Sequence, residues 1–184
     1  MRVERLSIPD VILVVPRRFE DQRGYFAETF NAKRLAEVGI DLPFIQDNQS
    51  LSRAKGTLRG LHCQVGPNAQ GKLVRAVRGA VWDVAVDIRI GSPSYGQWAA
   101  ATLTANGGEQ LWVPCGFLHG FITIEPDTEI FYKVTGDYDR DAERGVMWND
   151  PTLNLPWPID GEPVLSEKDK ILSAFADAFG WFPA

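Results

Sequence analysis

Residues 81–90 place apolar side chains at every second position, and this pattern constrains the fold more than any other feature of the sequence. A period of two over such a length is typical of a β-strand with two different faces. Asp83, Asp87 and Arg89 share the face opposite that of the apolar residues Trp82, Val84, Val86, Ile88 and Ile90. The segment therefore predicts a long strand.

Other segments predict further strands at short intervals. Residues 72–77 are expected to form a partner strand, because Arg78 and Gly79 supply a tight reversal before residue 81. Strands are also expected over residues 98–103, 111–113, 117–124 and 128–135, which turns rich in Gly, Pro and Asn separate. Strands at intervals of about 8–12 residues are typical of a β-sandwich or β-barrel.

Helices are expected only at the edges of this β-structure. Residues 31–38 begin with a cap-like Asn31 and end at Gly39, which predicts one short helix. Ser166 and Asp169 have the spacing of a capping box that opens a C-terminal helix. No repeat, low-complexity tract or linker divides the chain, so we expect one β-rich domain over residues 1–184.

Only two histidines and two cysteines occur among the 184 residues, which excludes several classes of protein. His62, His119, Cys63 and Cys115 lack the spacing of a structural zinc site. Two lone thiols favour a reducing compartment over a secreted disulfide scaffold. The N-terminal residues fit neither a signal peptide nor a membrane span, so we expect a soluble cytoplasmic protein.

The charge is unevenly distributed along the chain. The net charge of −5 argues against nucleic-acid polymers and anionic membranes as partners, since both are bound mainly through Lys and Arg. Residues 48–82, however, contain no acidic residue and six basic ones, Arg53, Lys55, Arg59, Lys72, Arg75 and Arg78. Each of them alone has the plain alternative of a solvated surface residue. As a group they predict an anion site suited to a phosphate-bearing small molecule.

Five residues are candidates for chemistry, and each also has a structural alternative. Histidine is the commonest general base near neutral pH, yet His62 and His119 have the alternative of satisfied core or surface histidines. Tyr132 lies on an apolar face, where most tyrosines are core residues and only some are acid catalysts. Lys72 has the alternative of a charged residue that protects an edge strand, and the capping box alone accounts for Asp169.

Short motifs along residues 19–170 carry a resemblance to a known family. In order, they are DQRGYFAE at 21–28, QDNQS at 46–50, GTLRGLHCQ at 56–64, KLVR at 72–75, DVAVDIR at 83–89, SP at 92–93, PCGFLHGF at 114–121, WNDP at 148–151 and LSEKD at 165–169. Together they resemble the dTDP-4-dehydrorhamnose 3,5-epimerases. One such motif is weak evidence, but this many in the same order are highly specific.

The resemblance implies a fold, an activity and partners. It implies an all-β, cupin-like antiparallel barrel (jelly roll) with a few short flanking helices, acting as a homodimer. The implied reaction inverts C3 and C5 of dTDP-4-dehydro-6-deoxy-D-glucose, without cofactor or metal, on the route to dTDP-rhamnose. Metal-binding cupins use about three histidines and a carboxylate, and the two histidines of this chain lead us independently to expect no transition metal.

The resemblance also implies roles for individual residues. His62 is the implied base, Asp169 the carboxylate that orients it, Tyr132 the acid and Lys72 the cation at the ketone oxygen. The implied substrate-binding residues are Arg23, Glu28, Gln46, Asp47, Asn48, Arg59, Lys72, His119, Tyr138, Glu143 and Lys168, with Tyr138 stacking on thymine. Simple alternation places Arg59 and His62 on opposite faces of one strand, and Gly60 between them predicts a bulge that reconciles the two.

Two other functions remain open at this point. A close variant of the reaction inverts only C3 or only C5 of a related dTDP-4-keto-6-deoxyhexose. A protein of a different class would be a non-catalytic module that binds sugar nucleotides through the basic residues. The set of His62, Lys72, Tyr132 and Asp169 argues against that module, because binding alone needs neither a base nor an acid.

Overall fold

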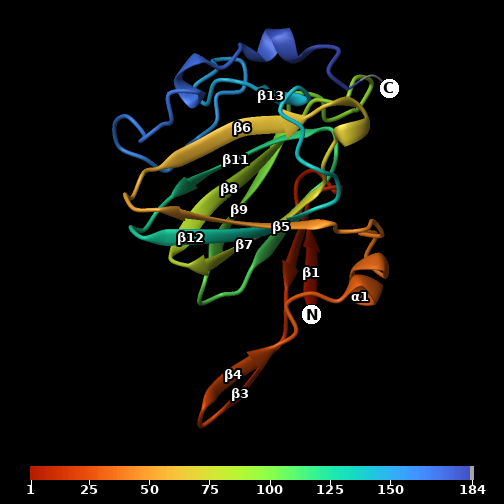
Figure 1. The fold of residues 1–184 in the computed structure, drawn as a ribbon, viewed down its shortest axis with the longest axis vertical. Helices are drawn as coiled ribbons and strands as arrows, with labels where there is room; N and C mark the ends of the chain where they lie inside the picture. The colour runs from red at the N-terminus through yellow and green to blue at the C-terminus, as the bar shows by residue number, and fades with distance from the viewer. Residues whose placement is uncertain (183–184) are drawn as a thin grey trace.

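The computed structural model describes residues 1–182 and shows two antiparallel β-sheets packed face to face (Figure 1). One sheet has the strand order β1-β2-β10-β7-β12-β5, and the other has the order β13-β6-β11-β8-β9. A hairpin of β3 and β4 projects away from both sheets. This architecture confirms the predicted all-β, cupin-like fold. The strands are β1 Arg2–Arg5, β2 Ile12–Val15, β3 Arg18–Asp21, β4 Gly24–Ala27, β5 Gln46–Ser52, β6 Leu58–Gln64, β7 Lys72–Arg78, β8 Ala80–Asp87, β9 Trp98–Thr104, β10 Gln110–Val113, β11 Phe117–Thr123, β12 Thr128–Val134 and β13 Glu143–Gly145.

The strands predicted from alternation are all present, but one predicted pairing is wrong. β7 was expected to pair with β8, whereas it lies between β10 and β12, and β8 lies between β11 and β9 of the other sheet. Gly79, with a φ of 69°, makes the tight reversal and passes the chain from one sheet to the other. A β-carbon there would lie 2.3 Å from Oγ1 of Thr128, so the crossing also needs the small residue.

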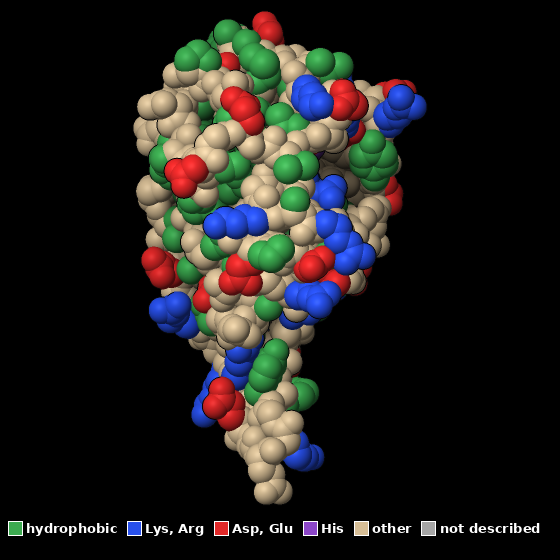
Figure 2. Space-filling view, turned by 90° about the vertical axis from the view of Figure 1, so that its left-hand side faces the viewer, with side chains coloured by type: hydrophobic (Ala, Val, Ile, Leu, Met, Phe, Trp, Pro, Cys, Tyr) green, Lys and Arg blue, Asp and Glu red, His purple; other side chains and the backbone are tan. Residues whose placement is uncertain are grey.

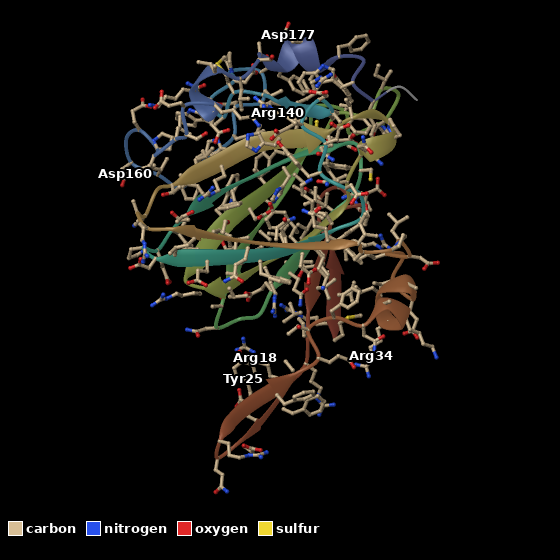
Figure 3. The ribbon with its side chains drawn as sticks, viewed as in Figure 1. Arg18, Tyr25, Arg34, Arg140, Asp160 and Asp177 are labelled. Carbon is tan, nitrogen blue, oxygen red and sulfur yellow. The ribbon has the colours of Figure 1, made fainter. Side chains whose placement is uncertain are left out.

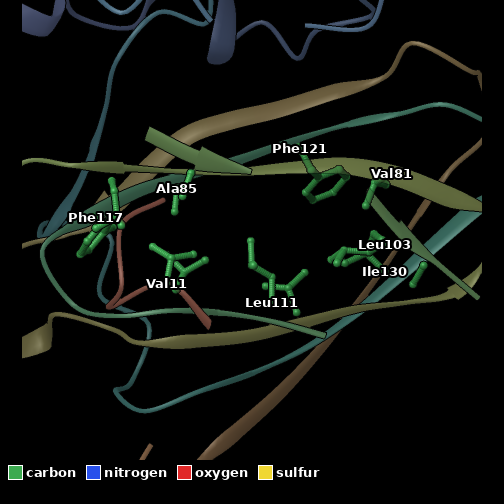
Figure 4. Close-up of a cluster of buried hydrophobic side chains, with 13 residues drawn as sticks. Val11, Val81, Ala85, Leu103, Leu111, Phe117, Phe121 and Ile130 are labelled. Carbon is green, nitrogen blue, oxygen red and sulfur yellow. The ribbon is translucent and has the colours of Figure 1, made fainter. Parts of the chain in front are cut away.

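The main core fills the space between the two sheets. It contains Val81, Ala85, Leu111 and Phe121, which come from β8, β10 and β11 (Figure 4). The polar face of β8 is therefore an interior face, and Asp83 is fully buried. The opposite face of β8 is buried as well, because the segment after β13 packs over it. β8 is consequently enclosed on both sides.

Two smaller clusters cover the outer faces of the sheets. The C-terminal segment contributes Phe175 and Ala178 to a cluster on the five-stranded sheet, and it lies above β6 and β13 in Figure 1. Phe175 is fixed there because its backbone N–H donates to Asp150 at 2.8 Å. The residues after Lys170, which match none of the sequence motifs, thus complete this cluster. Leu35 and Ile40 belong to a third cluster on the six-stranded sheet.

Helical structure is scarce, as predicted. The helix α1 spans Ala32–Ala36, and its Arg34 N–H donates to the Asn31 side chain at 3.2 Å. The C-terminal helix expected from Ser166 is only the 3₁₀ turn η2, Asp169–Ile171. Half of the capping box forms, since Asp169 N–H donates to Ser166 Oγ at 3.1 Å. The carboxylate of Asp169 points instead to His62, which leaves the box incomplete. Two further 3₁₀ turns are η1 Gly66–Asn68 and η3 Phe175–Ala178.

Candidate active site

A cleft opens between the two sheets. It consists of two adjoining cavities of about 380 Å³ and 160 Å³, which share His62, Lys72 and Tyr132 in their linings. His62 comes from β6 of one sheet, and Lys72 and Tyr132 come from β7 and β12 of the other. On the face shown in Figure 2, Lys and Arg side chains gather beside a hollow in the upper half of the molecule. The shared residues therefore face the cleft from both sheets.

His62 and Asp169 form a close pair at the centre of the cleft. The Nε2 atom of His62 lies 2.6 Å from Oδ1 of Asp169, and the two side chains are 28% and 4% exposed. Burial opposes ionisation of Asp169, but the hydrogen bond with His62 and the neighbouring Ser166 and Lys168 outweigh it, so the pKa of Asp169 is lowered. The carboxylate stays ionised and fixes the imidazole, which leaves Nδ1 free to accept a proton.

Lys72 lies in the middle of its sheet rather than at an edge. Its strand is paired on both sides, with Val113 of β10 and Val134 of β12 opposite Lys72 itself. The alternative of an edge-strand residue is therefore wrong. Burial lowers the pKa of the Lys72 ammonium, and the charge of Glu143 partly counteracts this. Lys72 is a desolvated amine that faces the cleft.

Tyr132 is both a core residue and a residue of the cleft. Its ring packs against the core between the sheets, and its side chain also lines both cavities. Burial raises the pKa of the phenol, with a smaller opposing effect from Arg59. The hydroxyl consequently keeps its proton at neutral pH and can act as a donor.

An irregularity at Gly60 brings Arg59 and His62 to the same cavity. The register of β6 against β11 shifts between His119 and Phe121, opposite Gly60, whose φ is 121°. A β-carbon on Gly60 would lie 2.7 Å from the carbonyl oxygen of His119, so only glycine allows this approach. The Arg59 side chain is held by Ser52 and by the Leu51 carbonyl at 3.2–3.3 Å. The expected bulge is confirmed.

A second group of polar residues lies at the smaller cavity, and Lys168 reaches it from the larger one. The Tyr138 hydroxyl donates to Glu143 at 3.0 Å, and the Lys168 ammonium contacts the same carboxylate oxygen at 2.5 Å. Gln46 donates to Asn48 at 2.8 Å on the opposite side, on β5. Burial opposes ionisation of Glu143, but its bonds with Lys168 and Tyr138 lower its pKa. This end of the cleft can accept hydrogen bonds and stack an aromatic ring.

Three of the expected substrate-binding residues do not reach this cleft. Arg23 lies at the tip of the β3–β4 hairpin and pairs with Asp21 at 2.6 Å. Glu28 pairs with Arg34 at 3.0 Å, beside α1. Asp47 lies on the opposite face of β5 from its two neighbours and contacts Lys133 at 2.8 Å. In Figure 3, the hairpin residue Tyr25 lies at the lower edge of the barrel, and the hairpin extends from there away from the cleft of its own chain.

The basic segment is not a single anion site. Of its six cations, only Arg59 and Lys72 line the cleft. Arg53 pairs with Asp127 at 3.0 Å, and Arg78 lies 3.7 Å from Glu129. Arg75 lies over the ring of Phe131. The two acids come from segments distant in the sequence, which is why the local charge count overestimated the site.

Two buried polar residues that shape the site, Gln64 and Asp83, have no role among the sequence predictions. Gln64 lines the smaller cavity, and its side chain bonds the backbone of Asp137 and Asp139 at 2.8 Å and 2.7 Å, on either side of Tyr138. Asp83 contacts Nε2 of His119 at 2.8 Å, and His119 lines the larger cavity. Gln64 follows His62 at a spacing of two, and Asp83 interrupts an apolar strand. Both patterns were visible in the sequence.

The remaining chemistry of the described residues is limited. Within residues 1–182, no three His, Cys, Asp or Glu side chains converge in a way that could hold a metal ion. Both cysteines of the chain are free thiols. Burial raises the pKa of Cys63 to about 12 and also raises that of Cys115, so both are neutral beside Lys72. None of the helices described is long and apolar enough to cross a membrane.

Comparisons with known proteins agree with this geometry. The profile of the family described as dTDP-4-dehydrorhamnose 3,5-epimerase matches residues 5–177. The protein of that name from Sinorhizobium fredii is 53% identical, over 92% of this chain and 87% of its own.

Two solved structures are also similar. The Bacillus anthracis dTDP-4-dehydrorhamnose 3,5-epimerase with TDP and PPi bound has a TM-score of 0.92 at 45% identity, covering 95% of this chain and 99% of its own. The Legionella pneumophila dTDP-6-deoxy-D-glucose-3,5-epimerase in complex with dTDP-4-keto-L-rhamnose has a TM-score of 0.92 at 39% identity, covering 100% and 99%. This chain belongs to the dTDP-4-dehydrorhamnose 3,5-epimerase family.

Proposed function

We propose that this protein inverts C3 and C5 of dTDP-4-dehydro-6-deoxy-D-glucose and releases dTDP-4-dehydro-L-rhamnose. The observation that carries this proposal is the placement of His62 and Tyr132 on opposite sheets of one cleft, with Lys72 beside both. An epimerase must remove a proton from one face of the ring and return one to the other. A base and an acid that face each other across the substrate meet that requirement.

The base is His62, acting through Nδ1. C3 and C5 flank the C4 ketone, so removal of either proton gives an enolate whose charge lies on O4. Because Nε2 of His62 is hydrogen-bonded to Asp169, Nδ1 is the ring nitrogen available to the substrate. The ionised Asp169 then stabilises the imidazolium that forms.

Lys72 stabilises the enolate oxygen. A preorganised cation in a desolvated cleft acts where charge develops and is worth about 3–4 kcal/mol of activation free energy. The buried, neutral thiols beside Lys72 do not offset its charge. Tyr132 then returns a proton to the carbon from the opposite side, and burial keeps its phenol protonated for this step.

The nucleotide occupies the rest of the cleft. Arg59 and His119 are placed to contact the diphosphate, because a guanidinium forms charge-assisted bonds with phosphate oxygens. Tyr138 offers its ring to the thymine at the other end, near Gln46, Asn48, Glu143 and Lys168. Binding and catalysis thus use separate parts of one cleft, and neither step calls for a metal or a cofactor.

The same proposal includes a homodimer in which the hairpin completes the partner's cleft. Arg23 and Glu28 do not line the cleft of their own chain and pair with Asp21 and Arg34 instead. The hairpin exposes Phe26, Tyr25 and Phe19 by 69%, 58% and 52%, an unusual amount of aromatic surface for a projecting segment. A second copy that covers these rings would receive Arg23 and Glu28. We place this dimer, one domain per chain, in the cytoplasm, where its two free thiols stay reduced.

Incubation with substrate in D2O tests the reaction. NMR should detect deuterium at both C3 and C5 of the product with the native protein, and at neither carbon with His62→Ala. Labelling at one carbon alone would identify a single-centre epimerase. Tight dTDP binding without any labelling would make the protein a binding module and refute the proposal.

Complementation tests the dimer. His62→Ala and Arg23→Ala chains are each expected to be nearly inactive. If Arg23 acts in the partner's cleft, each mixed dimer contains one intact site out of two. Random mixing makes about half of the dimers mixed, so it should restore about a quarter of native activity. If Arg23 acts in its own chain, mixing restores nothing, and sedimentation will show whether dimers form at all.

A further inference from the structure

Asp83 is a carboxylate buried in the core between the sheets. It is 0% exposed and lies on β8 between Val81 and Ala85, two members of the main core (Figure 4). Its partners across the strands are Phe121 on β11 and Ala101 on β9, neither of which carries charge. An acid in this position has a high desolvation cost, so its presence calls for an explanation.

The polar environment of Asp83 consists of one histidine. Its Oδ1 atom lies 2.8 Å from Nε2 of His119, and Oδ2 is buried without a hydrogen-bond partner among residues 1–182. Burial raises the pKa of Asp83, and the nearby His119 opposes that effect. Among residues 1–182, His119 is therefore the group that satisfies this buried carboxyl.

His119 connects this buried carboxylate to the cleft. Its side chain is 10% exposed and lines the larger cavity, and its register partner on β6 is His62. With Nε2 directed into the core, the Nδ1 atom is the remaining polar atom of the ring. A proton on Nδ1 would therefore be offered to the cleft.

We propose that Asp83 is a positioning residue of the active site, which holds Nε2 of His119 and orients the ring so that Nδ1–H donates to an anionic oxygen of the bound nucleotide sugar. The inference rests on the proposed function, because that substrate supplies such oxygens. One source is the diphosphate, which is anionic throughout the reaction. The other is O4 of the enolate, which is anionic only as the proton leaves.

The two sources have different kinetic signatures. A donor to the diphosphate stabilises substrate and transition state alike, so its loss raises KM and the Kd for dTDP with little change in kcat. A donor to the enolate oxygen acts in the transition state, so its loss lowers kcat and leaves dTDP binding unchanged. In both cases Asp83 acts through His119 and has no effect of its own on the ligand.

Asp83→Asn tests the inference, since it preserves shape and removes the charge. We expect kcat/KM to fall by about 10–100-fold, with the loss in either dTDP affinity or kcat. In a His119→Gln background the same substitution should change kcat/KM by less than about twofold, because the ring it acts on is gone. Asp83→Glu should restore part of the activity if its carboxylate reaches the ring.

Asp87→Asn is the matched control. Asp87 is also fully buried on the same face of β8, but its partners are Arg89, Ser92 and Ser94, outside the cleft. The Asp87→Asn substitution should lower the melting temperature and leave kcat/KM unchanged. The inference is overturned if Asp83→Asn retains native kinetics, or if it reduces kcat/KM equally in the His119→Gln background. Failure of the proposed function is separate, because the native protein itself would then show no exchange in D2O.

Discussion

Two histidine–aspartate pairs lie in the same cleft, and they differ in where the carboxylate comes from. His62 and His119 face each other on neighbouring strands, and each places Nε2 within 2.8 Å of its aspartate. Asp169 comes from a turn at the edge of the cleft, whereas Asp83 comes from the middle of a strand in the core. The same two side-chain types are therefore set in opposite environments.

The difference shifts the pKa of the two carboxyl groups in opposite directions. Asp169 is buried, but bonds with His62 and nearby polar groups lower its pKa. Asp83 has only His119 to oppose its burial, and its pKa is raised. A stably ionised carboxylate lets the facing ring take up and release a proton, as a base must. A carboxyl group whose ionisation is opposed by burial keeps its ring in one orientation, which suits a fixed donor.

The largest expected effect separates the two histidines. His62→Ala should reduce turnover by roughly 10⁴-fold, because it removes the base from both half-reactions. His119→Ala should cost about 10–100-fold, as the loss of one charge-assisted hydrogen bond. Rates of product formation by NMR, with dTDP affinity by calorimetry, measure both. Equal losses in the two variants would show that the pairs share one role.

The second prediction asks which group returns the proton. Tyr132→Phe should reduce product formation by roughly 10²–10³-fold and reduce wash-out of the first proton into D2O much less, because His62 still abstracts it. His119→Ala should slow both processes together. If Tyr132→Phe forms product at the native rate while His119→Ala does not, the second pair supplies the acid and the comparison above is wrong.

Alternation revealed the strands that carry Asp83 and His119, but not the partners of those strands. It did not predict β6, which carries His62, and Asp169 lies on a turn. Periodicity reports which residues share a face, and it does so well for β8 and β12. Pairing depends on contacts between segments distant in the sequence, so the assignment of β7 to the other sheet from β8 was out of reach. The strand β5 was also missed, because its residues Gln46–Ser52 are mostly polar and face the cleft or solvent.

The site itself was predicted unevenly for the same reason. Motif likeness located His62 and Asp169, although a capping box alone explained the latter. Gly60 correctly signalled the irregularity that brings Arg59 to the cavity. The number of basic residues in segment 48–82 overestimated the anion site, because Arg53 and Arg78 pair with acids that lie far along the chain. Asp83 received no role because its sequence pattern does not show which side of the strand faces the core.

The third prediction compares the two carboxylates. Asp169→Asn should lower kcat by about 10²-fold or more, because the base loses the group that fixes its tautomer and stabilises its protonated form. It should leave the Kd for dTDP within about twofold. Asp83→Asn should have the smaller effect. Steady-state kinetics of the two variants measure the ratio, and a larger loss for Asp83→Asn would reverse the order of the pairs.

The smallest effect concerns stability, and its sign differs between the pairs. Asp169 has a lowered pKa when folded, so it contributes stability that is present above pH 4 and is lost as the pH falls through the folded pKa. Asp83 has a raised pKa when folded, so the folded state holds its proton more tightly than the unfolded chain does. Its contribution is present below about pH 4 and is lost as the pH rises through the folded pKa.

Melting temperatures of the native protein, Asp169→Asn and Asp83→Asn between pH 3 and 7 test these opposite signs. The stability advantage of the native protein over Asp169→Asn should grow with pH, by about 2–4 °C for each 1 kcal/mol. Its advantage over Asp83→Asn should shrink or become a disadvantage over the same range. Both substitutions remove one carboxylate that faces one histidine. Two curves with the same slope would therefore mean that burial does not distinguish the pairs, and the assignment of a base to one and a fixed donor to the other would lose its physical basis.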